Sequence, residues 1–484
     1  MNQPPTDDFS QIAYPPGFRA RRGLNWGFLG LLYTSFYMCR YNLSIANPSI
    51  RHELGFTRAD MGIIITTALL AYACGQIING LITDKIGGKR AMLTGAAGTI
   101  VMNIFFGAAS LCGTLHPELS DAEHPAGRWL VHLNLFHTEI FFQLLMLFVA
   151  IRGIDGYMQA YGSPGFVKIN TAWFSHRERG RFAGIFGFMI NLGRVGIFQL
   201  GPALLAGFTF LWMWQIPPLH WRWLFWIPSG ICAFIALGMA LTVKETPEAA
   251  GFLHTHAAEA PSADTGTELG FFQLVLKIVT HPTIWIVASA YACTGAVRQA
   301  VDLWFPSYMK DKFQMDLASD KFKWLLGFGI PFVASAGSLA SGYISDVLFK
   351  GRRAPVAAGL YFLETGVILL AAQFHTANTA IFFLVLISLT ANSTHSILGT
   401  AAAMDIGGRK QAGFASGIID SFQYFGGSLA GIVLGRLLDK SLDNYFYFMA
   451  PFGLIGGILM LFIRGKIKPK AGTPLSAAPG ATRK

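Results

Sequence analysis

The sequence is poor in charged residues and in cysteine. Asp, Glu, Lys and Arg make up 13% of its 484 residues, whereas soluble proteins contain about 25%. Its five cysteines all lie in apolar stretches, far from one another. This composition excludes a soluble enzyme of this length, a disordered protein and a secreted disulfide scaffold. We expect the cysteines to pack between helices as small hydrophobic side chains.

Several functional motifs are also missing from the sequence. The histidines show no metal-ligand spacing, and there is no glycine-rich nucleotide loop and no nucleophile motif. We therefore expect no metal, no cofactor and no enzymatic activity. The first 22 residues lack the apolar core and cleavage site of a removable signal peptide. We expect the first apolar helix to direct membrane insertion instead.

Hydrophobic residues, by contrast, are abundant. They form 53% of the chain, with 41 Phe and 54 Gly, and they cluster in segments long enough to cross a bilayer, which takes about 20 residues. Two groups of six segments flank a polar stretch, which predicts an all-α integral membrane protein of twelve transmembrane helices in two pseudo-symmetric six-helix halves. The predicted spans are 24–48, 61–83, 90–114, 139–173, 180–206, 222–243, 283–309, 322–346, 354–374, 377–403, 412–437 and 443–463. The predicted domains are an N-terminal segment (1–23), the two halves (24–243 and 283–463), an inter-half loop (244–282) and a basic tail (464–484).

The basic residues indicate the orientation of the chain. If the termini and the loops after even-numbered spans lie on one side, that side holds 22 of the 37 Lys and Arg residues, the opposite loops nine and the spans six. Because basic residues concentrate in cytoplasmic loops, both termini are expected in the cytoplasm, as for a bacterial inner (plasma) membrane protein. The net charge of +11 therefore reflects topology. We expect the lipid bilayer, and no nucleic acid, as a partner.

A short motif occurs twice, 262 residues apart. Gly80-Leu-Ile-Thr-Asp84 ends the second span and Gly-Tyr-Ile-Ser-Asp346 ends the eighth, and each is followed by basic residues that include Arg90 and Arg352. The glycine would allow close helix approach, and the acid–cation pairs would act as gates that break when the halves rock. The motif resembles the signature loop of the major facilitator superfamily, which implies a twelve-helix fold with one binding site between the halves.

Two arginines lie inside predicted spans, where ionisable side chains are costly and indicate function. Arg40 lies in the first span, and Arg298 lies 258 residues later in the seventh, close to the repeat period. Pseudo-two-fold symmetry would place the two guanidinium groups opposite each other across a central cavity. A guanidinium group binds phosphate oxygens in a two-pronged geometry, so the pair suits a compact dianion. Alternatively, each arginine pairs with an acid to lock helices together, as Asp302 could do one turn from Arg298.

The residues around the two arginines resemble the organophosphate:phosphate antiporter family, which includes glycerol-3-phosphate and hexose-phosphate transporters. The matching stretches include Tyr37-Met-Cys-Arg-Tyr-Asn, Arg298-Gln-Ala-Val-Asp-Leu-Trp-Phe-Pro and Tyr424-Phe-Gly-Gly-Ser. The resemblance implies that the arginine pair binds the phosphoryl group, and that Tyr33, Tyr37, Gln159 and Tyr424 line the cavity. It also implies that inorganic phosphate leaves as the organophosphate enters.

The sequence departs from this family at two positions that would face the substrate. Gln76 stands where glycerol-3-phosphate transporters have a lysine, and Ile190 stands where they have a histidine. Arg194 follows one turn beyond Ile190, at a depth similar to that of the arginine pair. Three interpretations stay open for Arg194: it supplies a third cation that favours a substrate with a second anionic group, it pairs with an acid such as Asp155, or it snorkels outward. Arg152 and Asp155, three residues apart, are expected to pair with each other.

The sequence therefore predicts a secondary transporter that exchanges a phosphorylated or similarly anionic small metabolite for inorganic phosphate by alternating access, with a monomer sufficient for transport. One alternative is a proton-coupled transporter of another organic anion, such as a carboxylate or siderophore, with Asp302 or Asp155 carrying the proton. The other is a transporter-like sensor of sugar phosphate. Glu364 and Asp420 are further intramembrane acids that could relay protons, although packing and salt-bridge roles are more common for such residues.

Overall fold

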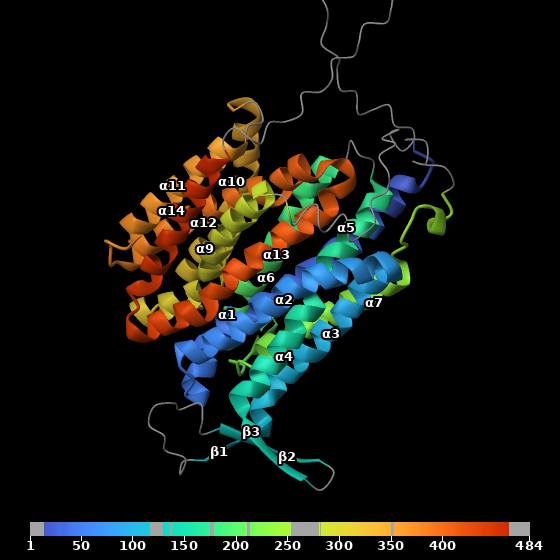
Figure 1. The fold of residues 1–484 in the computed structure, drawn as a ribbon. Helices are drawn as coiled ribbons and strands as arrows, with labels where there is room; N and C mark the ends of the chain where they lie inside the picture. The colour runs from blue at the N-terminus through green and yellow to red at the C-terminus, as the bar shows by residue number, and fades with distance from the viewer. Residues whose placement is uncertain are drawn as a thin grey trace, which may run out of the picture.

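The computed structural model describes residues 14–116, 129–135, 138–174, 179–210, 213–252, 280, 282–349 and 353–463. Helices form an N-terminal and a C-terminal half, which lie side by side (Figure 1). The N-terminal half contains α1 (Phe18–Leu54), α2 (Arg58–Ile86), α3 (Gly88–Ala109), α4 (Leu144–Gln159), α5 (Gly162–Trp173), α6 (Arg179–Ala206) and α7 (Trp223–Thr242). The C-terminal half contains α9 (Pro282–Phe313), a π-helical turn η5 (Phe322–Phe328), α10 (Gly329–Val347), α11 (Arg353–Ala371), α12 (Ala377–Ser396), a second π-helical segment η6 (Ile397–Ala402), α13 (Ala403–Lys440) and α14 (Asn444–Phe462).

These helices account for all twelve predicted spans. The fourth span is formed by α4 with α5, the eighth by η5 with α10 and the tenth by α12 with η6. Within the described residues, eight spans are long and apolar enough to cross a membrane by length and composition. The spans outside that set are those of α1, α4 with α5, α9 and α13. They carry most of the polar residues of the site described below.

The prediction of a single helical span over 139–173 was wrong in two respects. Its first residues form strand β3 (Thr138–Gln143), which pairs antiparallel with β2 (Trp129–Leu135), and β2 pairs with β1 (Gly113–Leu115). The apolar run in β3 extended the hydropathy signal into this sheet. The helix also breaks between α4 and α5, where Pro164 has no N–H to donate to the preceding turn. A second hairpin, β4 (Phe208–Phe210) with β5 (Trp214–Ile216), also lies outside the spans.

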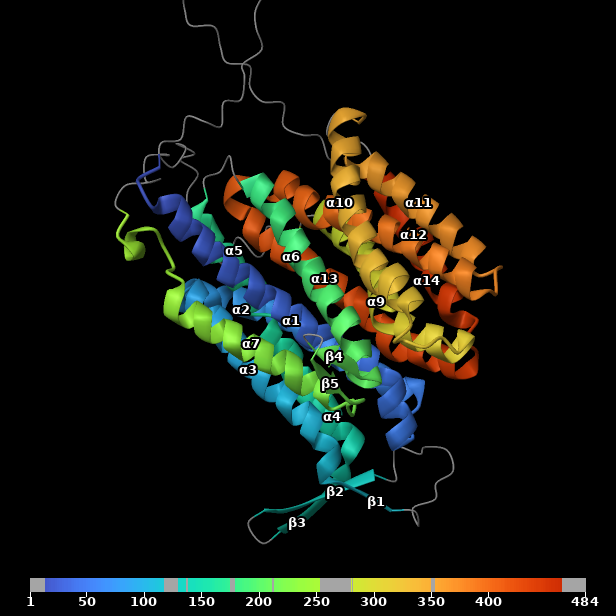
Figure 2. The same ribbon diagram turned by 180° about the vertical axis from the view of Figure 1, so that it is seen from behind.

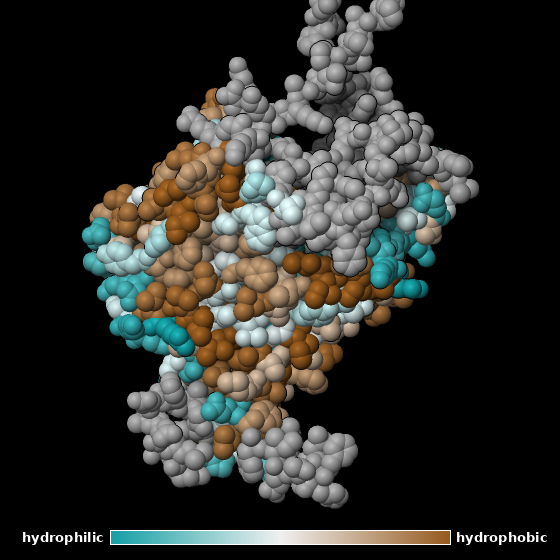
Figure 3. Space-filling model, in the orientation of Figure 1, coloured by the Kyte–Doolittle hydropathy of each residue, from teal (hydrophilic) through white to brown (hydrophobic). Residues whose placement is uncertain are grey.

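The two ends of the helices define two faces of the molecule. The terminal face is where α1 begins and α14 ends, and the sheet face is where β1–β3 lie (Figure 1). The described surface between the faces is largely hydrophobic, and hydrophilic residues gather toward the two ends (Figure 3). Cys39, Cys232 and Cys293 are buried as expected, whereas Cys74 and Cys112 are exposed.

The halves meet along a few helix pairs. Helix α2 packs against α13 and α1 against α9, and α6 lies between α1 and α10 (Figure 2). The α2–α13 contact is made backbone to backbone, since a Cβ atom at Gly62 would lie 2.5 Å from the carbonyl oxygen of Gly431. Beside it, Thr66 Oγ1 accepts from Ile432 N at 2.8 Å and donates to Ser428 O at 2.7 Å. This glycine contact brings the two halves together on the sheet-face side of the molecule's centre.

Candidate functional site

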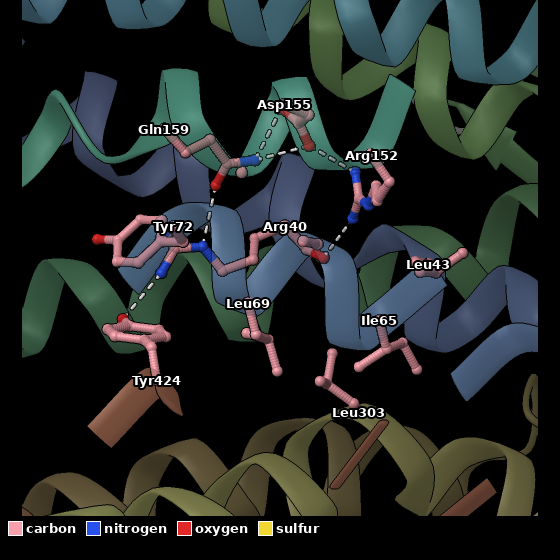
Figure 4. Close-up of a pocket in the computed structure, with 12 residues that line it drawn as sticks. Arg40, Leu43, Ile65, Leu69, Tyr72, Arg152, Asp155, Gln159, Leu303 and Tyr424 are labelled. Atoms are coloured by element: carbon pink, nitrogen blue, oxygen red, sulfur yellow. Dashed lines mark hydrogen bonds and ion pairs between the residues drawn. The ribbon is translucent and has the colours of Figure 1, made fainter. Parts of the chain in front are cut away.

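Arg40 is held by residues of both halves, Gln159 of the first and Tyr424 of the second (Figure 4). It is 8% exposed. Its Nε donates to Gln159 Oε1 at 2.9 Å, and its Nη1 donates to the hydroxyl of Tyr424 at 3.1 Å. The guanidinium carbon lies 4.7 and 4.2 Å from the ring centroids of Tyr37 and Tyr72, within cation–π range. Its Nη2 is buried with no hydrogen-bond partner among the described residues.

A network on α4 fixes the orientation of Arg40. As expected, Arg152 and Asp155 form an ion pair, with 2.7 Å between Nη1 and Oδ2. Gln159 Nε2 donates to both oxygens of Asp155 at 3.0 and 3.1 Å, which leaves the amide oxygen of Gln159 facing Arg40. Arg152 Nη2 also donates to the backbone carbonyl of Arg40 at 2.7 Å. The charge of Asp155 is therefore compensated on its own helix.

Arg298 on α9 is 4% exposed and lies against α12 and α13. The Gln423 amide is oriented so that its nitrogen faces Asp420 and its oxygen faces Arg298. In this orientation the amide oxygen accepts from Arg298 Nη1 at 2.8 Å. The same Nη1 lies 3.4 Å from His395 Nε2. Arg298 Nε lies 3.8 Å from Asp302 Oδ2, beyond hydrogen-bond distance, and has no hydrogen-bond partner in the described part of the chain. Within the described part of the chain, each of the two predicted arginines thus keeps one nitrogen donor without a hydrogen-bond partner.

Consecutive residues of α13 contact the two arginines, because Gln423 bonds to Arg298 and Tyr424 bonds to Arg40. The packing of α9 against α13 fixes this arrangement. A Cβ atom at Gly295 would lie 1.8 Å from the carbonyl oxygen of Gln423, so only glycine permits this close approach. The structure therefore brings the predicted pair together at one level of α13, with one guanidinium from each half.

Arg194 is fully buried and forms an ion pair with Asp302 across the two halves. Its Nη1 also donates to Asn191 Oδ1 at 3.0 Å. Asp302 accepts a hydrogen bond from the hydroxyl of Tyr41 at 3.3 Å as well. Of the interpretations left open for Arg194, pairing with an acid is the one observed. The acid is Asp302, on α9, and not Asp155.

The remaining predicted residues lie toward the terminal face. The ring of Tyr33 packs against that of Tyr37, with 5.5 Å between centroids. Gln76 Nε2 donates to the hydroxyl of Tyr72 at 3.0 Å, and the Gln76 side chain also reaches the carboxylate of Asp420. The predicted residues of the first half therefore lie around Arg40 together with Tyr424, and Arg298 lies beside this group.

The predicted gating residues are only partly described. Asp84 is highly exposed and lies 3.6 Å from Lys168 Nζ, and Arg90 is exposed too. The side chain of Asp346 and all of Arg352 lie outside the described residues. Close helix approach at Gly80 was a wrong prediction, since a Cβ atom there would meet nothing within 4 Å.

The tight position of this loop is Gly87 instead. It has a φ of 91°, and a Cβ atom there would lie 2.7 Å from Glu245. Glu245 Oε1 also accepts from Gly88 N at 2.6 Å. The residues just beyond α7 therefore pack against the loop between α2 and α3.

Sequence reasoning missed several residues of the site, including Tyr72, Tyr291, His395 and Gln423. His395 carried the same signal as the arginines, because it is an ionisable residue inside a predicted span. Asp420 was recognised as an intramembrane acid but was not placed at the site. Polar neutral residues such as Gln423 carry no such signal, because their role depends on which helix they face.

A group of charges at the sheet face, which we call the sheet-face cluster, also joins the two halves. Asp311 Oδ2 lies 2.5 Å from Arg51 Nη2 and 2.8 Å from Arg58 Nη2. Asp439 accepts from the backbone N–H groups of Arg58 at 2.9 Å and Ala59 at 2.8 Å. A carboxylate of the C-terminal half thus caps the first turn of α2, where the helix dipole favours negative charge.

Comparison with known proteins identifies the fold. The family described as Major Facilitator Superfamily matches residues 29–431. The chain belongs to the Major Facilitator Superfamily. A bacterial homolog of the human lysosomal transporter Spinster, solved in an inward-facing conformation, shares this superfamily fold with a TM-score of 0.70 at 15% identity, covering 96% of this chain and 100% of that one.

Relatives similar in sequence include proteins named for the transport of phosphate esters. A probable hexose phosphate transport protein of Chlamydia muridarum is 26% identical over 89% of this chain and 88% of its own length. The glycerol-3-phosphate transporter of Bacillus subtilis is 25% identical, with 90% and 88% covered. The membrane sensor protein UhpC of Salmonella typhimurium is 25% identical, with 89% and 88% covered. These relatives confirm the resemblance to the organophosphate:phosphate antiporter family.

The charged side chains at the junction of the two superfamily halves do not balance. The cations are Arg40, Arg152, Arg194 and Arg298. The acids are Asp155, Asp302 and Asp420. With all groups ionised, the site carries one net positive charge. Asp155 is paired with Arg152, and Asp302 is paired with Arg194 and lies 3.8 Å from Nε of Arg298. The arrangement can therefore bind an anion.

Proposed function

We propose that this protein exchanges a phosphorylated or similarly anionic small metabolite for inorganic phosphate by alternating access. The observation that carries the proposal is the pair of guanidinium groups, Arg40 and Arg298, held by adjacent residues of α13. Each keeps a buried donor without a partner among the described residues, Nη2 of Arg40 and Nε of Arg298. An unsatisfied buried donor costs about 1–3 kcal/mol, and more when it is charged. A phosphoryl group would supply the missing acceptors.

The surroundings of the pair favour a phosphate ester over an anion whose organic part is apolar. Phenol rings of Tyr37, Tyr72 and Tyr424 surround Arg40. Their hydroxyl groups can donate hydrogen bonds to further phosphoryl oxygens or to hydroxyl groups of the organic part. The relatives named for hexose phosphate and glycerol-3-phosphate support the same substrate class.

The distribution of contacts between the halves supports alternating access. The described hydrogen bonds and ion pairs between the halves lie at the level of the site or on its sheet-face side, down to the sheet-face cluster. Rocking of the halves about the glycine contact of α2 and α13 would open the sheet-face cluster and close the terminal face. The positive charge of the empty site opposes closure, whereas a bound anion offsets it on either trip, which favours exchange over net transport.

The membrane orientation is part of the proposal. The excess of Lys and Arg on the side of the terminal face supports cytoplasmic termini in a bacterial inner membrane. The terminal face would then open to the cytoplasm.

Phosphate exchange in vesicles tests the proposal. Purified protein is reconstituted into vesicles loaded with inorganic phosphate, and uptake of labelled phosphate is followed in the presence of phosphorylated three- to six-carbon compounds. We expect uptake only when the vesicles contain phosphate, and loss of uptake in the Arg298→Gln variant. Arg436→Gln is the matched control, because Arg436 is an exposed arginine of α13 away from the site. Fast net efflux without a counter-anion would overturn obligate exchange.

A sensor is the competing function, because the relatives include a membrane sensor protein at similar identity. The same purified protein distinguishes the two functions. Binding of sugar phosphate, followed by tryptophan fluorescence in detergent, together with no exchange in vesicles would identify a sensor. Binding together with exchange identifies a transporter.

A further inference from the structure

Asp420 lies one turn from Tyr424 on α13, next to the anion site but separate from the arginine pair. The side-chain nitrogen of Gln423 donates to Asp420 Oδ1 at 3.2 Å, while the oxygen of the same amide accepts from Arg298 at 2.8 Å. A single amide therefore connects this carboxylate to a guanidinium group that we assign to the substrate. An anion bound to Arg298 therefore changes the electrostatic potential at Asp420, because the two groups are close together in the protein interior.

Side chains of both halves surround the carboxylate. Gln76 of α2 and Tyr291 of α9 lie beside Asp420. The hydroxyl of Tyr291 is also hydrogen-bonded to His395 Nδ1 at 2.5 Å, and His395 Nε2 lies 3.4 Å from Arg298. Two chains of contacts therefore lead from Arg298 toward Asp420, one through Gln423 and one through His395 and Tyr291.

Among the described residues, Asp420 differs from the other two acids at the site in having no counter-ion within ion-pair distance. Asp155 is paired with Arg152, and Asp302 is paired with Arg194. No Lys or Arg nitrogen of the described residues forms an ion pair with Asp420 within 4.0 Å. Its negative charge is balanced only at longer range, by the two guanidinium groups that the substrate would occupy.

The other titratable groups around Asp420 are poorly suited to hold an exchangeable proton. From α1 these are Arg40 and Tyr33, from α9 Arg298 and Tyr291, from α12 His395, and from α13 Tyr424. The arginines keep their protons at all accessible pH values, and the phenols do so near neutral pH. A second proton on the His395 ring would face the guanidinium of Arg298 at 3.4 Å, where like charges repel.

We propose that Asp420 takes up one proton when an anion binds, so that the substrate is carried together with that proton. The inference rests on the proposed anion site. In the empty site, Arg40 and Arg298 favour the ionised carboxylate. A bound dianion neutralises both arginines and places negative charge beside Asp420, so a proton from the adjoining solution adds to a carboxylate oxygen. The proton leaves again when the anion leaves, and no covalent bond of the substrate changes.

The charges at the site agree with this stoichiometry. The single net positive charge of the empty site becomes a net negative charge with a dianion bound, and returns to neutrality only when one proton accompanies the dianion. By linkage, protonation of Asp420 strengthens anion binding by the same factor as anion binding strengthens protonation. Each crossing of a dianion would therefore carry one proton with it, so one-for-one exchange of two dianions moves no net proton and no net charge.

The test uses monofluorophosphate, which remains a dianion near neutral pH, so that any proton taken up belongs to the protein. Affinity is measured by calorimetry on purified full-length protein between about pH 6 and 8.5, and proton uptake is measured with a dye in weakly buffered solution. For the native protein we expect uptake of one proton per anion at the alkaline end, where affinity falls about tenfold per pH unit. For Asp420→Asn we expect no uptake and an affinity independent of pH. Glu364→Gln is the matched control, a buried intramembrane acid on α11, and should behave like the native protein.

Three results would overturn the inference. These are binding to the native protein without proton uptake, proton uptake preserved in Asp420→Asn, or the Asp420→Asn behaviour appearing in Glu364→Gln. If Asp420→Asn does not fold, Asp420→Glu decides, because moving the carboxylate should shift the midpoint of the pH profile and an unchanged profile would contradict the assignment. Failure of both monofluorophosphate and inorganic phosphate to bind the native protein would instead reject the proposed function, and the inference with it.

Discussion

Replacing Asp302 by asparagine should destabilise the protein severely, because it leaves the fully buried guanidinium group of Arg194 without a counter-charge. Breaking one partner of a buried ion pair costs about 3–5 kcal/mol. Removing both charges together avoids that penalty, so the double variant Arg194→Gln/Asp302→Asn should lose only about 1–2 kcal/mol, mainly from weaker hydrogen bonds to Tyr41 and Asn191. The expected coupling energy between the two positions is at least about 2 kcal/mol.

Equilibrium unfolding of purified protein in mixed detergent–SDS micelles, followed by tryptophan fluorescence, measures these differences. Arg436→Gln, an exposed arginine of the same protein, should change the unfolding free energy by less than about 0.5 kcal/mol. The reasoning is refuted if Asp302→Asn is as stable as the control, or if the double variant loses the sum of the two single losses. Either result would mean that the pair does not compensate its own charges.

The Arg194→Gln variant also tests whether Arg194 contacts the substrate in addition to its ion pair with Asp302. If the guanidinium acts as a third cation for substrate, affinity for a phosphorylated acid should fall by about 1–3 kcal/mol while affinity for inorganic phosphate changes little. If Arg194 serves only Asp302, the two affinities should change together or not at all. Binding of the two substrates, followed by calorimetry, separates these outcomes.

Replacing Arg40 or Arg298 by lysine keeps the charge but removes the two-pronged donor geometry, so phosphate exchange in vesicles should fall about 10- to 100-fold; normal exchange by the double lysine variant would contradict the assignment. Replacing Asp311 by asparagine releases two arginines whose ion pairs are each worth about 1 kcal/mol after screening, so the sheet-face cluster should open in about 30-fold more molecules. Distances between spin labels on either side of that cluster measure this shift, and an unchanged distance distribution would refute it. Asp84→Asn should alter the exchange rate while equilibrium anion affinity stays the same, and a loss of affinity at normal turnover would instead place Asp84 in the binding site.

The fold was predictable from the sequence because span length and apolar content are local properties. The prediction of the fourth span was wrong because apolar content does not distinguish a strand from a helix. The apolar residues of β3 satisfied the hydropathy pattern although their backbone pairs with β2. The break between α4 and α5 was marked by Pro164, whose effect on the preceding turn is local and could have been included.

The site was predictable only in part, because charge inside a span signals importance without naming the partner. Arg40 and Arg298 were found through their cost in a membrane and through the internal repeat. The partner of Arg194 lies 108 residues away on a helix of the other half, and no periodicity within one helix indicates such a contact. The sheet-face cluster was missed for a related reason, since its charges lie at helix ends outside the predicted spans, where charged residues are ordinary.

The glycine contact between α2 and α13 has a mechanical consequence. Gly62 lies close to the sheet-face end of α2, whereas Ile86 at the other end of the helix is 24 residues away, or about 36 Å at 1.5 Å per residue. In the proposed rocking motion, the contact would therefore be the fulcrum of a lever with a short arm and a long arm. A tilt of about 10° around it moves the far end of α2 by about 6 Å. A Cβ atom at Gly431 would lie 2.6 Å from Gly62 O, so the Gly431→Ala substitution would push the two helices apart at this point. The resulting displacement of α2 would be largest at its far end, on the terminal face.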